Sequence, residues 1–141
     1  MMLTKTTTTT TTTTMTTWLR RAIWLGTAGY WIGLFILTHT PTALPLVVIK
    51  SDKTGHFLGH GLLAAAIFAS LRVAGRRDPV LAVLVIGMIF GAVDEWLQIP
   101  IPGRSCELLD WFADVAGVAT AVTVGALITR WRDARAERTT W

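Results

Sequence analysis

The chain has 141 residues, of which 52% are hydrophobic and only 16% are charged, with a mean hydropathy of +0.50. This composition excludes an ordinary soluble domain and is typical of a small integral membrane protein. In a soluble protein, a net charge of +4 would suggest a surface that binds nucleic acid. Here, however, the positive residues gather beside apolar runs. We therefore expect a lipid bilayer, and no nucleic acid, as the partner. Cys106 is the single cysteine, which excludes an intramolecular disulfide and a cysteine-rich metal site.

The chain opens with a threonine tract, and for residues 1–17 we predict a disordered tail because they offer no apolar face. Met15 is an alternative start of translation. Residues 22–40 follow, uncharged and long enough to cross a bilayer core of about 30 Å at about 1.5 Å per residue. A signal peptide is the competing interpretation. It fits less well, because the apolar run is long and no small-x-small cleavage pattern precedes Pro41.

Prolines end the first run and introduce an extended connection over residues 41–53. Three more apolar runs follow, at 56–71, from Pro79 to the acidic pair at 94–95, and at 108–129. Asp78 is placed to cap the third helix, with Pro79 as its first residue. We therefore predict an all-α fold, an integral membrane bundle of four transmembrane helices over residues 18–131, followed by a basic tail at 132–141.

The basic residues divide unequally between the two sides of such a bundle. One side receives Lys5, Arg20, Arg21, Arg72, Arg76, Arg77, Arg130, Arg132, Arg135 and Arg138, and the other receives only Lys50, Lys53 and Arg104. Because Lys and Arg concentrate in cytoplasmic loops, both termini are predicted to be cytoplasmic. Most of the acidic residues then fall on the extracytoplasmic side.

The stretch 94–114 interrupts the apolar pattern with five of the nine carboxylates and one arginine. For ionisable residues at the ends of membrane-spanning helices, a functional site is the preferred explanation and a helix cap is the alternative. His56, Glu95 and Asp114 each lie 16 residues from the cytoplasmic end of their run, or roughly 24 Å along a helix. We therefore expect these three side chains at one depth, near the outer boundary of the membrane.

Residues three or four positions apart share a helix face, and this spacing predicts three polar rows that meet. The first contains Asp52, His56 and His60, the second Glu95 or Asp94 with Gln98, and the third Asp110, Asp114 and the packing glycine Gly117. The candidate functional pocket consists of Asp52, Lys53, His56, Glu95, Gln98, Arg104, Asp110 and Asp114. No catalytic residue, cofactor or metal is assigned, although His56 and Glu95 are candidate metal ligands.

These motifs resemble the VanZ-like membrane proteins, a family named for an accessory factor in glycopeptide resistance. The likeness runs from about residue 38 to 125 and depends on order and spacing together. It comprises Asp52, Lys53, His56 and Phe57, then Asp94, Glu95 and Gln98, then Gly103 and Arg104, and finally Asp110 and Gly117. The chain departs from the family pattern at His60, where Tyr or Phe is common, and at Asp114, where Asn is usual.

The resemblance implies a four-helix membrane protein with its motif residues on the outer side, linked in some members to teicoplanin tolerance. It implies no settled reaction. Some of these residues also have a purely structural explanation. Asp52 fits a helix cap equally well, and Arg104 fits a solvated charge in a loop. A structural role explains Glu107 and Cys106 best.

Three functions are compatible with the pattern. The first is a non-enzymatic factor of the cell envelope whose polar pocket binds the headgroup of a cell-wall or lipid-linked precursor. The second is a membrane-embedded hydrolase or transferase that uses His56 and Glu95, although the sequence carries no HExxH, nucleophile-elbow or P-loop motif. The third is a small proton-coupled carrier, disfavoured because no acidic residue falls near mid-membrane.

Overall fold

The computed structural model describes residues 7–41 and 52–138, with side chains from residue 17 onward. It contains four helices, α1 (Thr7–Thr38), α2 (Asp52–Val73), α3 (Val80–Gln98) and α4 (Leu108–Arg138), so the predicted all-α fold of four helices is confirmed. Most of the predicted extended connection lies outside the described residues.

The first helix differs from its prediction at its N-terminal end. It begins at Thr7 and includes part of the tract for which the sequence predicts disorder. Threonine is a weak helix former, but extending an existing helix costs much less than nucleating one, because each added residue gains a backbone hydrogen bond. The apolar segment supplies the nucleus, and the helix extends from it into the threonine tract.

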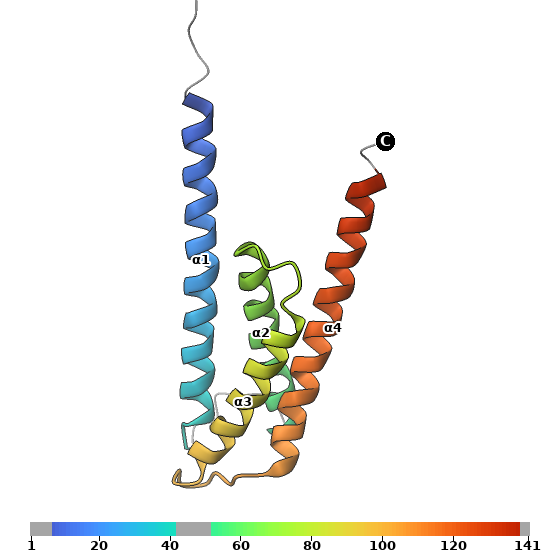
Figure 1. Cartoon of the computed structure of the whole chain (residues 1–141). Coiled ribbons are helices and arrows are strands. Elements are labelled where there is room, and N and C mark those ends of the chain that lie inside the picture. The colour runs from blue at the N-terminus through green and yellow to red at the C-terminus, as the bar shows by residue number, and fades with distance from the viewer. Residues whose placement is uncertain (1–6, 42–51, 139–141) are drawn as a thin grey trace, which may run out of the picture.

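All four helices run roughly along one direction. The turn between α2 and α3 and the connection between α3 and α4 lie on opposite sides of the bundle. Figure 1 shows α1 beginning and α4 ending at the top, and α2 and α3 joined on the same side at a lower level, so that α1 and α4 extend beyond this turn. The connection between α3 and α4 lies at the lower end. The basic residues at 72–77 and 130–138 therefore lie on the same side of the bundle as the first turns of α1, as four alternating helices require.

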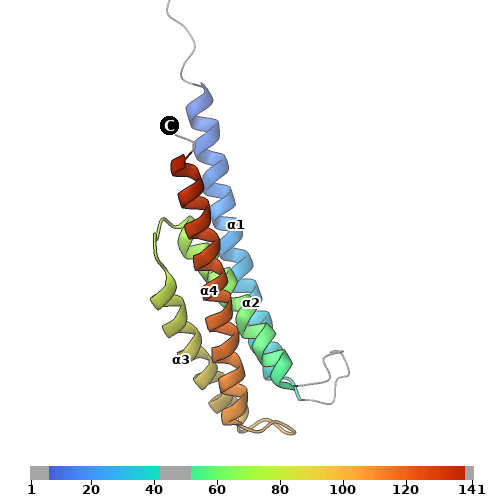
Figure 2. The ribbon, with the colours of Figure 1, turned by 90° about the vertical axis from the view of Figure 1, so that its right-hand side faces the viewer.

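The closest packing is between α2 and α4, and in Figure 2 α2 crosses behind α4. A Cβ atom added to Gly117 would lie only 2.1 Å from the carbonyl oxygen of Phe57. One added to Gly61 would lie 3.2 Å from the carbonyl oxygen of Gly117. Small residues allow helix backbones to approach closely in membrane proteins, and here glycines on both helices do so.

A short apolar core fills the space between the helices. Its buried members are Leu34, Leu63, Ala64, Ile67, Phe68, Val83, Val118 and Val122. The first helix is also attached to α2 by polar contacts, because the Thr27 and Ser70 hydroxyls lie 2.8 Å apart and Tyr30 donates a hydrogen bond of 3.1 Å to the Gly59 carbonyl. These contacts fix the position of α1 against the pair formed by α2 and α4.

Two local hydrogen-bonded motifs stabilise the turn between α2 and α3. The N–H groups of Gly75 and Arg76 donate to the carbonyls of Arg72 and Leu71, a Schellman motif that requires the positive φ of +94° at Gly75. The Asp78 carboxylate accepts a hydrogen bond of 3.2 Å from the N–H of Val80, which is the contact expected of a capping residue. The third helix begins one residue later than predicted.

The outer surface of the bundle is largely apolar, with side chains such as Leu25 and Leu81 each 73% exposed. An apolar surface of this extent is stable against lipid and not against water. Among the described residues, three helices are long and apolar enough to span a membrane: α2, α3 and α4. The protein thus has the build of a small helical membrane protein. The first helix is not among the three.

Candidate functional site

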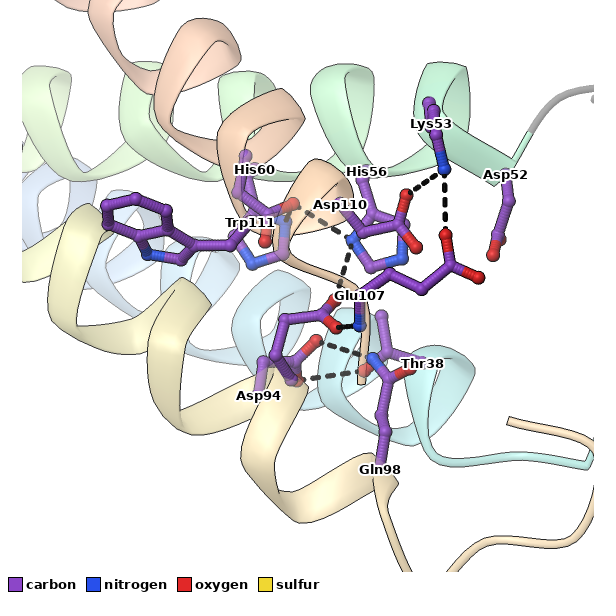
Figure 3. Close-up of polar contacts among 12 residues, drawn as sticks. Thr38, Asp52, Lys53, His56, His60, Asp94, Gln98, Glu107, Asp110 and Trp111 are labelled. Atoms are coloured by element: carbon purple, nitrogen blue, oxygen red, sulfur yellow. Dashed lines mark hydrogen bonds and ion pairs between the residues drawn. The ribbon is translucent and has the colours of Figure 1, made fainter. Parts of the chain in front are cut away.

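A buried polar cluster occupies the lower end of the bundle, beside the α3–α4 connection. Its members are His56, His60, Asp94, Glu95, Gln98, Asp110 and Asp114, each at most 5% exposed, and Figure 3 shows side chains from α2, α3 and α4 converging there. A charged rim surrounds it, formed by Asp52, Lys53, Arg104 and Glu107. The structure therefore brings all eight residues of the predicted pocket to one end of the molecule.

The centre of the polar cluster is the Asp114 carboxylate. Its Oδ1 atom lies 3.0 Å from His56 Nδ1, with which it forms a hydrogen bond, and 2.7 Å from His60 Nδ1, whose orientation does not form one. Glu95 Oε1 approaches His56 Nδ1 at 3.6 Å. His56, Glu95 and Asp114, for which residue counting predicts one depth, are thus in mutual contact range.

The neighbouring Asp94 carboxylate is fully buried and has its own set of partners. Thr38 donates a hydrogen bond of 3.0 Å to Oδ1, and the Gln98 amide donates one of 3.1 Å to Oδ2, as Figure 3 shows. His39 Nδ1 lies 3.6 Å from Oδ1. The bond from Thr38 holds the end of α1 against α3, and the bond from Gln98, within α3, occupies the second carboxylate oxygen. The predicted pocket residue Gln98 thus contacts Asp94 rather than the Asp114 centre.

The charged rim is organised by Lys53. Its ammonium group lies 2.9 Å from Asp110 Oδ1 and 3.0 Å from Glu107 Oε2, so it links the start of α2 to the start of α4. The hydrogen bond from Lys53 holds the pKa of the Glu107 carboxyl below its usual range, with a second contribution from the Ser105 hydroxyl. The Glu107 N–H also donates a hydrogen bond of 2.9 Å to Glu95 Oε2. Glu107 therefore connects the rim to the buried cluster.

Arg104 belongs to the rim but is only loosely paired. Its guanidinium contacts Asp52 Oδ1 and the Leu37 carbonyl, both at 3.4 Å, which are long distances for hydrogen bonds. Its Nε atom is buried and has no hydrogen-bond partner. The Asp52 side chain is 63% exposed, so this predicted pocket residue stands at the edge of the site. Arg104 thus retains donor capacity for a further group.

The side chains of the polar cluster are almost completely buried. A groove of about 660 Å³ does lie between α2 and α4, but residues such as Phe57, Leu62 and Val124 make its lining apolar, and it extends toward Arg72 and Asp133 at the opposite end. A ligand of the predicted headgroup type would therefore meet the charged rim first, and only small species could enter the polar cluster without rearrangement.

Sequence reasoning missed several residues of this site. Thr38 and His39 come from α1, and no spacing rule connects a threonine in an apolar run with a carboxylate on another helix. His60 was placed in one row with Asp52 and His56 but was left out of the predicted pocket. Its place on the same face as His56, one turn along α2, was the available signal, and the two rings are nearly parallel with centroids 6.0 Å apart.

Comparison with known proteins adds no relative to this description. No family model, curated protein or solved structure matches the chain.

Proposed function

We propose that the chain is a four-span membrane protein of the cell envelope, of the VanZ-like kind, with cytoplasmic termini and its polar cluster and charged rim near the outer surface. In this proposal the site binds the polar headgroup of a cell-wall or lipid-linked precursor. The observation that carries it is the convergence of charged and polar groups from all four helices at one end of an otherwise apolar bundle. Buried ionisable residues are costly in a membrane protein and mark functional sites.

The bilayer orientation rests on the charge distribution. The end where α1 begins and α4 ends carries the arginines of the α2–α3 turn and of α4, while the end with the polar cluster carries most carboxylates. Basic residues favour the cytoplasmic side. Membrane crossing by α1 belongs to the proposal as well, and is supported by its attachment along α2 through Thr27 and Tyr30.

The balance of charge narrows the kind of headgroup. Within residues 7–41 and 52–138, this end of the bundle carries two permanent cations, Lys53 and Arg104, against six carboxylates. The carboxylates are those of Asp52, Asp94, Glu95, Glu107, Asp110 and Asp114. A purely anionic group would be repelled by this surplus. A headgroup that presents amines or hydroxyls to the carboxylates, together with one phosphate for Arg104, is complementary to the site.

A second candidate function is a hydrolase or transferase on such a substrate. The observation in its favour is His56, held between the Asp114 and Glu95 carboxylates at 3.0 and 3.6 Å. A histidine oriented by a carboxylate is a suitable general base. Turnover of the headgroup probe used below, lost in His56→Gln, would favour this candidate over simple binding.

Binding is tested with the full chain in nanodiscs, using a polyprenyl diphosphate that carries an amino-sugar headgroup and, for comparison, the bare polyprenyl diphosphate. We expect tighter binding of the headgroup-bearing lipid, and a loss of about tenfold in Arg104→Gln, because one charged hydrogen-bonding group is removed. Arg72→Gln is the matched control, since Arg72 forms an ion pair of the same length, 3.4 Å, at the opposite end. Equal binding of both lipids, or equal losses in both variants, would overturn the proposal.

A further inference from the structure

We propose that His56, His60 and Asp114 form a binding site for one divalent transition-metal ion, of the zinc class. One nitrogen from each histidine and one oxygen from Asp114 lie within 4.8 Å of one another, and all three residues are buried. These three residues belong to the polar cluster of the proposed function, but metal binding by them can be measured without any headgroup lipid.

The environment of the His60 side chain is the observation that indicates a ligand. Its side chain is 1% exposed, and neither ring nitrogen has a hydrogen-bond partner. Buried polar atoms without partners are rare in folded proteins, and each one requires an explanation. His60 Nδ1 nevertheless lies 2.7 Å from Asp114 Oδ1, in an orientation unsuited to a hydrogen bond. A lone pair on the His60 ring therefore remains available to coordinate a cation.

Two further atoms support a cation at this position. Asp114 Oδ2 is buried without a partner, and so is Glu95 Oε1, which lies 3.6 Å from His56 Nδ1. A divalent ion would offset the negative charge of both carboxylates. Glu95 would then stand beside the ion as a fourth ligand or as an acceptor for a bound water molecule.

The donor set decides the class of ion. Two imidazoles and a carboxylate suit zinc and its neighbours in the transition series, whereas calcium and magnesium prefer sites made of oxygen atoms alone. The His56 ring must give up its hydrogen bond with Asp114 and coordinate as a neutral imidazole. Metal binding is therefore expected to release a proton and to weaken as the pH falls.

A second group, Asp52, His56 and Asp110, has similar spacing but is a weaker candidate. Asp52 is exposed, and Asp110 already accepts a hydrogen bond from Lys53. Because His56 belongs to both groups, a substitution at His60 distinguishes them.

The test uses full-length protein purified in detergent, freed of metal with a chelator and titrated with Zn²⁺, with bound metal measured by elemental analysis. We expect one ion per chain and at least about a tenfold loss of affinity in His60→Gln. His39→Gln is the matched control, because His39 lies at the same end beside Asp94 and outside the three ligands. If the wild-type protein binds no more zinc than His60→Gln, or if His39→Gln loses as much affinity, the proposal fails.

A second measurement requires no variant. Cobalt(II) in a site with histidine ligands gives visible absorption bands, and we expect the wild-type protein to develop them at one equivalent and to lose them on addition of Zn²⁺. Absence of both the bands and stoichiometric zinc would overturn the metal site. Metal binding without recognition of the polyprenyl diphosphate would instead overturn the proposed function and leave the metal site standing.

Discussion

Thr38 and Asp94, 56 positions apart in the chain, are joined by a buried hydrogen bond of 3.0 Å. This contact ties the last turn of α1 to α3 at the level of the polar cluster. It is the reason that α1, which contributes no residue to the predicted pocket, takes part in the site.

Replacement of Asp94 by alanine is expected to lower the free energy of unfolding by about 1–2 kcal/mol, the range for buried polar contacts in membrane bundles. The loss arises because the Thr38 hydroxyl and the Gln98 amide both lose their acceptor. Denaturation in mixed micelles measures the change. Thr120→Val serves as the control, because the Thr120 hydroxyl bonds only to the Ala116 carbonyl on its own exposed helix face. Equal losses in the two variants would contradict the role assigned to Asp94.

Replacement of Gly117 by alanine is expected to destabilise the bundle by about 1–3 kcal/mol, the usual cost of overpacking. The added Cβ would fall 2.1 Å from the Phe57 carbonyl oxygen, so α2 and α4 would have to separate. Gly33→Ala is the matched control, since nothing lies within 4 Å of the position of its Cβ, and should be neutral or stabilising. Thermal unfolding of both variants checks the prediction, and an unchanged Gly117→Ala protein would refute the close approach of α2 and α4.

The Glu107 carboxyl should titrate below the usual range, because Lys53 and Ser105 donate hydrogen bonds to its charged form. A lowered pKa in the folded state means that the contact with Lys53 contributes to stability above the ordinary carboxyl pKa and is lost as the pH falls through the lowered value. Carbon NMR of labelled glutamate side chains follows this titration. In Lys53→Met the pKa of Glu107 should rise toward its ordinary value, and no movement would show that the pair does not form.

Orientation in the membrane is accessible through Cys106, which is exposed in the connection between α3 and α4. We expect a membrane-impermeant maleimide to label it in intact cells. Labelling only after lysis would reverse the proposed topology and place the polar cluster on the cytoplasmic side.

Much of the site was predictable because it lies on regular helices. Spacing alone placed His56 and His60 on one face of α2, and counting along each helix placed Glu95 and Asp114 at the same level. Apolar run lengths predicted the four helices for the same reason. These are properties of single helices, and helix geometry determines them without knowledge of the packing.

Properties that depend on contacts between helices were not predictable. The sequence could not assign Thr38 to Asp94, nor could it show that Lys53 pairs with Glu107 as well as with Asp110. It predicted one polar pocket, and it could not show that these residues divide between a buried cluster and a charged rim. Both features depend on how closely α2 and α4 approach, and that distance is set at the Gly117 contact.

The central claim is that His56 on α2 and Asp114 on α4 meet within the bundle, and cysteine cross-linking tests it most directly. In a Cys106→Ser background, a short bifunctional thiol reagent should join the pair His56→Cys and Asp114→Cys within one chain, because the native side chains meet at 3.0 Å. The control pair, Leu81→Cys with Asp114→Cys, should not be joined, because Leu81 is 73% exposed at the far end of α3. No cross-link in the first pair, or equal cross-linking in both, would contradict the account.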